Sequence, residues 1–385
     1  GVWIATVDAI TRKLAEGGSV APLDATRVLY TKGNQIWSVG LADDAKPAMV
    51  AQPRGAVEDL TVAPDGSAVA FTSERRMHGF VGVYRFADKS LRYLDASVDT
   101  DQSPAWSPDS KSVAFVRVAA GSRRQGGAHR EDAEPWSIRV ADAATGRGRE
   151  VWKARAGVGS AFHPLASGTL LWGGGRLVFP WERDGWSHLY SVAEGGGEAA
   201  LLTPGEFEVE HAALAPDRRR VVFSSNQGDI DRRHIWRVGV TAGAKAAALT
   251  SGAGIEWSPA ALDGGAVAFL RSDARQPARA AIQTAGGAGR DLAEGLLAAD
   301  FPASAMVEPQ PVIFPAADGM PIHGQLFLPR GGAAKKPALI FFHGGSRRQM
   351  LLGWHYMYYY NNAYALNQYL ASQGYLVLSV NYRSG

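Results

Sequence analysis

A histidine followed by two glycines is the pattern in this sequence with the clearest capacity for chemistry. His343, Gly344 and Gly345 directly follow the apolar run Ala338–Phe342, which is typical of a buried β-strand. Glycine accepts a positive φ and places no side chain between backbone and substrate. An N–H group of this turn can therefore face the oxyanion that develops when a carbonyl is attacked, and the His343 imidazole can donate a similar hydrogen bond. An ordinary turn between a strand and a loop is the alternative.

A charged loop at residues 121–134 holds a second set of candidate binding residues. Arg123 and Arg124 lie near its beginning, and Glu131 and Glu134 lie near its end. Guanidinium and carboxylate groups suit the terminal carboxylate and the free amine of a peptide. The loop is therefore a candidate for binding a terminal amine or carboxylate, and a solvated surface loop is the alternative.

A third set of candidates follows the glycine pair. Arg347 can meet a substrate carboxylate, and Trp354 and Tyr356 belong to an aromatic stretch that can wall a pocket for an apolar or proline-like side chain. The alternatives are a surface position for Arg347 and packing at a domain interface for the two aromatic residues.

A repeat occupies most of the chain upstream of these residues. Units such as Ala63–Phe71 and Ser107–Phe115 begin with a Pro-Asp turn, in which Pro fixes φ and Asp bonds its own backbone, and continue into a Val-Ala-Phe strand. The prolines lie at positions 22, 64, 108, 164, 216 and 259, in steps of 42, 44, 56, 52 and 43 residues. This period matches four-stranded propeller blades. We expect an all-β propeller of about seven blades, or eight, over residues 1–305, with strand Val2–Val7 completing a blade elsewhere in the ring.

The pattern changes after about residue 305. A helix is expected from Asn362 to Gln373, among four strands at Val312–Phe314, Ile322–Leu328, Ala338–Phe342 and Tyr375–Val380. The last two strands are apolar runs, as expected for strands buried on both faces. Strand, helix and strand in this order make one βαβ unit of a doubly wound sheet. Residues 306–385 are therefore expected to be the N-terminal part of an α/β domain.

Three further stretches point to a known family: Glu182–Tyr190, Thr203–Val209 and Leu378–Gly385. With the His-Gly-Gly turn, they make the chain resemble the prolyl oligopeptidase family of serine peptidases, in particular its dipeptidyl peptidase IV and acylaminoacyl peptidase branches, over essentially its whole length. The resemblance implies a propeller that admits short peptides to an α/β-hydrolase domain with a Ser-Asp-His triad. It also implies that Gly344 and Gly345 belong to the oxyanion loop, with His343 where one branch has a tyrosine that assists the oxyanion hole.

The sequence departs from that family in two respects. No serine lies in a Gly-x-Ser-x-Gly nucleophile elbow, and in the family the nucleophile, acid and base follow the strand at which this chain ends. We therefore expect the triad to lie beyond this chain, in the same protein or on a second chain, and the 385 residues alone to be inactive. The chain also lacks the adjacent glutamate pair that holds the substrate amine in the dipeptidyl peptidase IV branch, so that specificity is not implied.

Composition narrows the function classes. Zero cysteines exclude disulfides, thiol catalysis and cysteine-ligated zinc, and neither a metal nor a cofactor is expected. Lys+Arg 40 nearly balance Asp+Glu 37, and no basic run exceeds Arg218–Arg220, so no nucleic-acid partner is expected. The sequence contains no run of 18 apolar residues, so no membrane-spanning helix is predicted. A removable signal peptide is not visible, and both periplasm and cytoplasm remain open, with a bacterial type of protein expected from the resemblance.

Three functions follow from these observations. The leading one is a serine peptidase that cleaves short peptides and is compatible with a homodimer. The second is a propeller that binds a protein partner without catalysis, and the third is an esterase or amidase of the same fold, because fold does not fix chemistry. Residue preference, and exo- against endo-cleavage, stay undetermined by the sequence.

Overall fold

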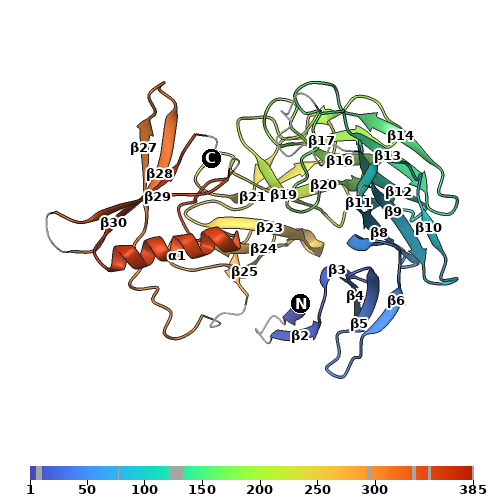
Figure 1. Ribbon diagram of the computed structural model, residues 1–385, viewed down its shortest axis with the longest axis horizontal. Helices are drawn as coiled ribbons and strands as arrows, with labels where there is room; N and C mark the ends of the chain where they lie inside the picture. The colour runs from blue at the N-terminus through green and yellow to red at the C-terminus, as the bar shows by residue number, and fades with distance from the viewer. Residues whose placement is uncertain are drawn as a thin grey trace. The chain divides into compact units, whose positions relative to one another are not determined.

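The computed structural model describes residues 1–5, 11–76, 78–120, 133–292, 297–331, 335–345 and 348–383. The chain forms two compact units (Figure 1). Unit 1 comprises Gly1–Pro204, Asp217–Val221 and Val238–Ala246, and unit 2 comprises Gly205–Pro216, Val222–Arg237 and Ala247–Gly385.

Unit 1 is built from small antiparallel sheets of the propeller-blade type. Its first two strands, β1 (Val2–Ala5) and β2 (Thr11–Ala15), pair with each other, so the expectation that the N-terminal strand completes a distant blade is wrong for its described residues. The blade strands follow in chain order: β3 (Gly18–Pro22), β4 (Arg27–Lys32), β5 (Gln35–Gly40) and β6 (Ala48–Ala51); β7 (Ala56–Val62), β8 (Ala68–Arg75), β9 (His78–Arg85) and β10 (Leu91–Tyr93); β11 (Thr100–Trp106), β12 (Ser112–Val118), β13 (Ser137–Asp142) and β14 (Gly148–Lys153); β15 (Leu171–Gly173), β16 (Arg176–Trp181), β17 (His188–Ala193) and β18 (Ala200–Leu201).

The Pro-Asp turns have the predicted chemistry. The Asp65 carboxylate accepts a hydrogen bond from the Ser67 amide at 3.0 Å, and Asp109 accepts one from the Lys111 amide at 3.1 Å. An Asp that bonds the backbone two residues ahead fixes a tight turn, and the Val-Ala-Phe strand that follows each turn is buried. These two observations confirm the strand–turn period read from the sequence.

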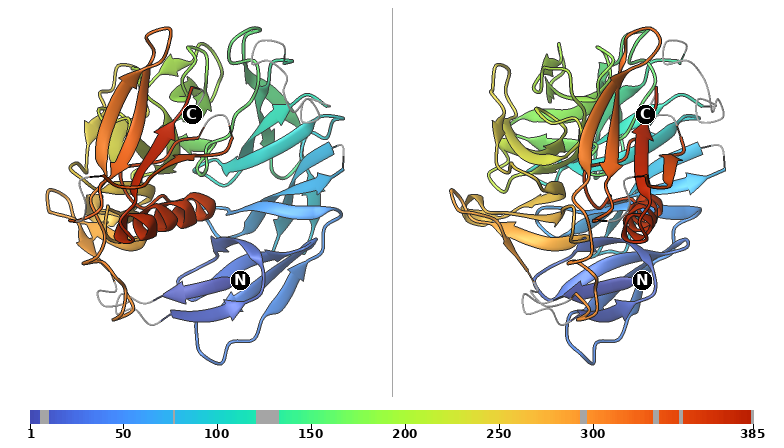
Figure 2. Two further views of the ribbon diagram at one scale, coloured as in Figure 1. Left: turned by 60° about the vertical axis from the view of Figure 1, so that its left-hand side comes forward. Right: turned by 90° about the vertical axis from the view of Figure 1, so that its left-hand side faces the viewer.

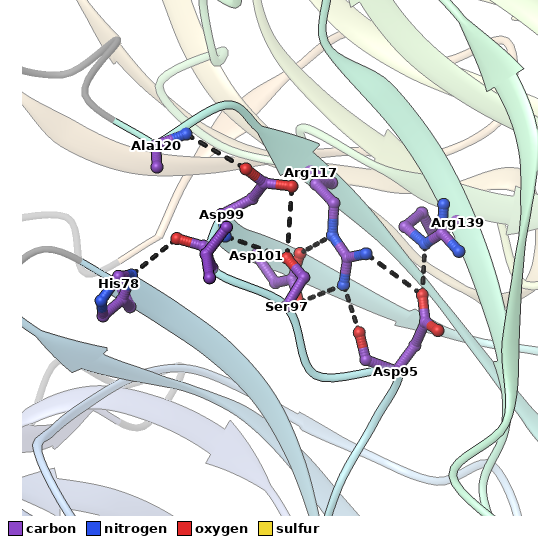
Figure 3. A network of polar contacts seen from close by, with 9 residues as sticks. His78, Asp95, Ser97, Asp99, Asp101, Arg117, Ala120 and Arg139 are labelled. Carbon is purple, nitrogen blue, oxygen red and sulfur yellow. Dashed lines mark hydrogen bonds and ion pairs between the residues drawn. The ribbon is translucent and has the colours of Figure 1, made fainter.

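A network of ion pairs joins β11, β12 and β13 in unit 1 (Figure 3). Arg117 donates to both carboxylate oxygens of Asp101, at 2.7 and 2.9 Å, and to Asp95 at 3.2 Å. Arg139 pairs with the same Asp95 carboxylate. Asp101 is 1% exposed, and this burial raises the pKa of Asp101 to about 6, although the Arg117 guanidinium opposes the shift.

Unit 2 holds a further complete blade and a second kind of sheet. The preceding blade is divided between the two units. Its strands are β19 (Val209–Leu214), β20 (Arg220–Ser225), β21 (His234–Gly239) and β22 (Ala247–Ala248). The complete blade has β23 (Ile255–Ala261), a 3-10 turn at Asp263–Gly265, β24 (Val267–Ser272), β25 (Arg279–Gln283) and β26 (Arg290–Asp291). The described residues thus contain six sheets of the four-strand blade pattern, two of them joined by pairing of β9 with β11.

The second kind of sheet has the order β27-β28-β30-β29. Its strands are β27 (Gln310–Pro315), β28 (Pro321–Phe327), β29 (Ala338–Phe342) and β30 (Leu376–Asn381), and helix α1 (Tyr358–Ser372) connects β29 to β30. β29 and β30 are parallel, as a βαβ unit requires. The helix packs on this sheet (Figures 1 and 2) through contacts such as that between the Phe327 and Tyr364 rings, at 5.4 Å.

The expectation that β29 is buried on both faces is wrong for the described residues. Leu339, Ile340 and Phe342 are 36%, 57% and 60% exposed. β29 is the edge strand of its sheet in the described chain, and the helix that follows it covers β28 and β30 instead. The apolar run therefore predicted the strand correctly, but the burial that it predicted for this strand is wrong.

Candidate active-site loop

The turn that follows β29 lies beside the end of β30. Parallel pairing places Phe342 opposite Val380, so the residues that continue from these two strands, His343 and Tyr382 among them, emerge at the same edge of the sheet. Carboxyl ends of parallel strands are where open α/β sheets place their functional loops. Gly344 and Gly345 are both exposed there, which leaves their backbone accessible to a ligand.

Two tyrosine hydroxyls hold the carbonyl groups of the glycine pair. Tyr360, in the first turn of α1, donates to the Gly344 carbonyl at 2.5 Å. Tyr382, after β30, donates to the Gly345 carbonyl at 2.9 Å. Gly345 has a φ of 78°, a left-handed conformation that glycine adopts without the penalty paid by other residues. The backbone of the turn is therefore held by side chains 16 and 37 positions further along the chain.

His343 is packed between these two tyrosines. Its ring stacks on Tyr382 at 4.6 Å with an interplanar angle of 18° and meets the edge of Tyr360 at 6.2 Å. Burial lowers the pKa of His343, which favours the neutral imidazole. Its Nδ1 lies 3.3 Å from the Gly344 carbonyl, and among the described residues its Nε2 has no hydrogen-bond partner.

The segment that leads from the glycine pair to α1 is bound to the blade strands of unit 2. Gln349 accepts a hydrogen bond from Arg233 at 2.9 Å and donates one to the Ile230 carbonyl at 2.9 Å. The Trp354 amide donates to the Asp273 carbonyl at 3.0 Å, and the Ser272 hydroxyl donates to the Trp354 carbonyl at 2.6 Å. The path of the chain after the turn is thus set by blade residues.

An ion pair between buried Arg233 and half-buried Glu210 adjoins this segment. The Arg233 Nε donates to Glu210 Oε1 at 2.8 Å, and the Tyr356 hydroxyl donates to Glu210 Oε2 at 2.6 Å. Burial opposes the charge on Glu210, but Arg233 and Tyr356 outweigh it and hold the pKa of this carboxyl below its usual value. Burial, assisted by the positive charge of Arg233, lowers the pKa of the neighbouring His355 to about 4.

The structure brings together only part of the predicted set of site residues. His343, Gly344 and Gly345 form the turn described above. Tyr356 has no hydrogen bond or ring contact with this turn among the described residues: it donates to Glu210 and packs on the Trp257 ring. Trp354 is 6% exposed and packs in the core against Phe301 and Tyr364. Glu134 is exposed in unit 1. Arg123, Arg124, Glu131 and Arg347 lie outside the described residues.

Sequence reasoning missed four residues that shape this site: Glu210, Arg233, Tyr360 and Tyr382. Glu210 was within reach, because it directly follows the Thr203–Val209 stretch that carries the family resemblance. Tyr382 lies inside the Leu378–Gly385 stretch that carries the resemblance, and Tyr360 ends the aromatic stretch that contains Trp354 and Tyr356. Neither stretch shows which carbonyl its hydroxyl meets, and an arginine after a turn, such as Arg233, gives no signal of its own. The role of Arg233 depends on a contact with Gln349, 116 positions away, and the two tyrosines act on carbonyl groups 16 and 37 positions away.

Among the described residues, no group of three or more His, Cys, Asp or Glu side chains is arranged to hold a metal ion. The helices that the structure describes are also too short or too polar to cross a bilayer.

The chain matches one protein-family model in sequence and several solved structures in fold. Residues 137–272 match the family model described as the dipeptidyl peptidase IV N-terminal region. The chain is similar in structure to a puromycin-hydrolyzing peptidase of Mycobacterium tuberculosis, with 20% identity and a TM-score of 0.72 over 95% of this chain and 57% of that one. No curated protein sequence matches the chain.

Two further solved structures show the same fold. Dipeptidyl peptidase 4 of Porphyromonas gingivalis has 14% identity and a TM-score of 0.62, over 93% of this chain and 56% of that one. A putative dipeptidyl aminopeptidase IV of Bacteroides ovatus has 19% identity and a TM-score of 0.64, over 96% and 59%. This chain therefore spans less than two thirds of the length of these structures, and the expected propeller fold is confirmed.

Proposed function

We propose that this chain, which belongs to the prolyl oligopeptidase family and carries its N-terminal propeller region, is part of a serine peptidase that cleaves short peptides. In this proposal residues 1–305 are a propeller that restricts access to the site, and residues 306–385 are the beginning of the α/β-hydrolase domain. Serine, histidine and aspartate outside these residues supply attack and proton transfer.

The glycine pair after β29 is the observation that carries the proposal. Its backbone is exposed, Gly345 is in the left-handed conformation, and both carbonyls are held by tyrosine hydroxyls. Fixed N–H donors at the carboxyl end of a sheet strand are what an acyl-transfer site needs, because preorganised donors stabilise the developing oxyanion without reorganising during the reaction. A binding propeller without catalysis has no use for such a turn.

The substrate class follows from the relatives and from what the Glu210 carboxylate does here. Two similar structures are those of a puromycin-hydrolyzing peptidase and of a dipeptidyl peptidase 4, so aminoacyl amides and dipeptidyl amides are the first substrates to test. Both Glu210 oxygens are engaged, one by Arg233 and the other by Tyr356. We therefore do not assign recognition of the substrate amine to Glu210.

The exposed apolar strand β29 supports the presence of further hydrolase structure against this sheet. Leu339, Ile340 and Phe342 project from an edge strand whose outer side has no partner among the described residues. Strands of parallel sheets are normally covered on both faces by helices. The remaining catalytic segment, in the same protein or as a second chain, is the partner we propose for this edge.

The test is active-site labelling of the protein purified from its native cells. It is treated with a fluorophosphonate and its intact mass is measured beside that of the recombinant 385-residue chain. One adduct on the native protein, together with hydrolysis of puromycin or of dipeptidyl anilides, is expected, and the 385-residue chain should stay unlabelled. An unlabelled native protein that binds a partner would overturn the peptidase proposal. Hydrolysis of esters without hydrolysis of amides would point to an esterase.

A further inference from the structure

The hydrogen bond from Tyr360 to Gly344 determines which way the next N–H points. In a trans peptide the carbonyl of one residue and the N–H of the next point in opposite directions. Because the Tyr360 hydroxyl holds the Gly344 carbonyl at 2.5 Å, the Gly345 N–H is directed away from Tyr360. The hydrogen bond from Tyr382 to the Gly345 carbonyl, at 2.9 Å, fixes the orientation of the peptide that follows Gly345.

Without such bonds the Gly344–Gly345 peptide could rotate easily. Glycine populates positive and negative φ about equally, so a Gly-Gly peptide has little intrinsic preference for one orientation. A rotated peptide would present a carbonyl oxygen where an oxyanion needs a donor, and this would repel the developing negative charge. A hydrogen bond on each carbonyl selects the orientation in advance.

Each tyrosine is itself held in place. Tyr360 is 1% exposed, and its ring lies 5.3 Å from that of His355 and 5.6 Å from that of Tyr359. Tyr382 is stacked on the His343 ring. Side chains locked by packing can position a neighbouring group within the narrow tolerance that catalysis requires. The two hydroxyls therefore act on the turn from packed side chains, one in α1 and one directly after β30.

We propose that Tyr360 and Tyr382 are positioning residues that hold the glycine-pair peptide with its N–H toward the reacting carbonyl oxygen. This inference rests on the proposed peptidase function, and it adds to that function two residues that act through the backbone without touching the substrate. It predicts that both hydroxyls matter for the transition state and little for binding of the substrate in its ground state.

The experiment compares Tyr360→Phe and Tyr382→Phe with Tyr358→Phe, whose ring is 86% exposed, in the native full-length protein. We expect kcat to fall about 10- to 100-fold in the first two variants, since one oxyanion donor is worth at least that much, with KM changed less than about twofold. Affinity for a peptide aldehyde, which forms a tetrahedral adduct, should fall in parallel with kcat. Affinity for the cleaved product should not change.

The outcomes separate the inference from the function on which it rests. If the wild-type protein hydrolyses amides and both variants match Tyr358→Phe, the positioning role is overturned and the peptidase function stands. If the wild-type protein has no activity and takes no fluorophosphonate, both are overturned. Tyr360 is buried, so its variant is also checked by thermal unfolding. Tyr382→Phe, at a half-buried position, gives the answer if Tyr360→Phe unfolds.

Discussion

The hydroxyl of Tyr356 donates a 2.6 Å hydrogen bond to the carboxylate of Glu210, which lies 146 residues earlier in the chain. The same carboxylate accepts a hydrogen bond from Arg233, whose guanidinium also reaches Gln349. The Glu210 carboxylate, which is half-buried, therefore joins blade strand β19 to the segment that follows the glycine pair. This arrangement makes the position of the turn dependent on the integrity of the blade.

Replacing Tyr356 by phenylalanine should lower the free energy of unfolding by about 1–3 kcal/mol, because one oxygen of the half-buried Glu210 carboxylate then loses its donor. Tyr358→Phe, at an exposed position, should change it by less than about 0.5 kcal/mol. Urea unfolding followed by tryptophan fluorescence measures both. A raised KM with unchanged stability in Tyr356→Phe would instead show that this ring forms a wall of the substrate pocket.

Gly345→Ala should reduce kcat by at least about 10-fold, because the N–H that we propose as an oxyanion donor is displaced. Alanine is strained at a φ of 78°, and its Cβ would lie 3.2 Å from the Arg348 side chain. Gly319→Ala is the matched control: its φ is 88°, and no atom lies within 4 Å of the added Cβ. Both variants should lose about 1–2 kcal/mol of stability, so equal losses of activity would indicate general destabilisation.

The stability contributed by Asp101 should fall as the pH rises from about 4 to about 6. The pKa of this carboxyl is raised from 3.8 to about 6 in the folded protein, so the folded state binds a proton that the unfolded state has lost, and stability decreases with pH in this window. Asp101→Asn abolishes this titration. The variant should therefore gain stability relative to the wild type between pH 4 and pH 7, by an amount on the order of 3 kcal/mol.

Measuring the denaturation midpoints of both proteins at half-unit pH intervals tests this expectation. A constant difference across the range would show that Asp101 titrates at its ordinary pKa. Arg117 keeps its contact with Asp95 in the variant, which limits the side effects of the substitution (Figure 3).

His355 should produce the opposite pH dependence in unit 2. Burial lowers its pKa from 6.5 to about 4, so the unfolded state binds a proton that the folded state rejects, and stability is lost as the pH falls from about 6.5 to about 4. The full effect is on the order of 3 kcal/mol. Asparagine can accept the Met357 N–H in an Asx turn, as His355 Nδ1 does at 2.9 Å.

His355→Asn should therefore lose less stability than the wild type on acidification, whatever its stability at pH 7. The measurement is again the midpoint of urea unfolding, taken at pH 7 and at pH 4.5. If acidification shifts the two midpoints equally, His355 is not protonated on unfolding and its neutral buried state is refuted.

Local rules were enough to predict the blades. A proline that fixes φ and an aspartate that bonds the amide two residues ahead both act within one turn, so the Asp65 and Asp109 turns could be read from their own residues. The strand Ala338–Phe342 was predicted with the bounds that the structure gives it. The helix began earlier than predicted, at Tyr358, because its N-cap residue Met357 makes no side-chain cap bond and gives no sequence signal.

For the candidate site, the sequence points most directly to the residues whose backbone would carry the proposed chemistry. Gly344 and Gly345 are identifiable because their residue type and their place after a strand limit what the turn can do. Tyr360 and Tyr382 were not identifiable, because their hydroxyls gain meaning only when α1 folds back and β30 pairs with β29. Sequence patterns report on periodicity within an element and contain no information on which distant side chain meets which carbonyl.

The exposure of β29 has a consequence for handling this chain by itself. An edge strand with unpaired backbone groups and apolar side chains such as Ile340 and Phe342 is a template for pairing with the same strand of another molecule. Solutions of the isolated chain should therefore become turbid with rising concentration, and a lysine at position 340 should delay the onset. Colloidal behaviour would then report whether this edge is open or occupied before any enzymology is done.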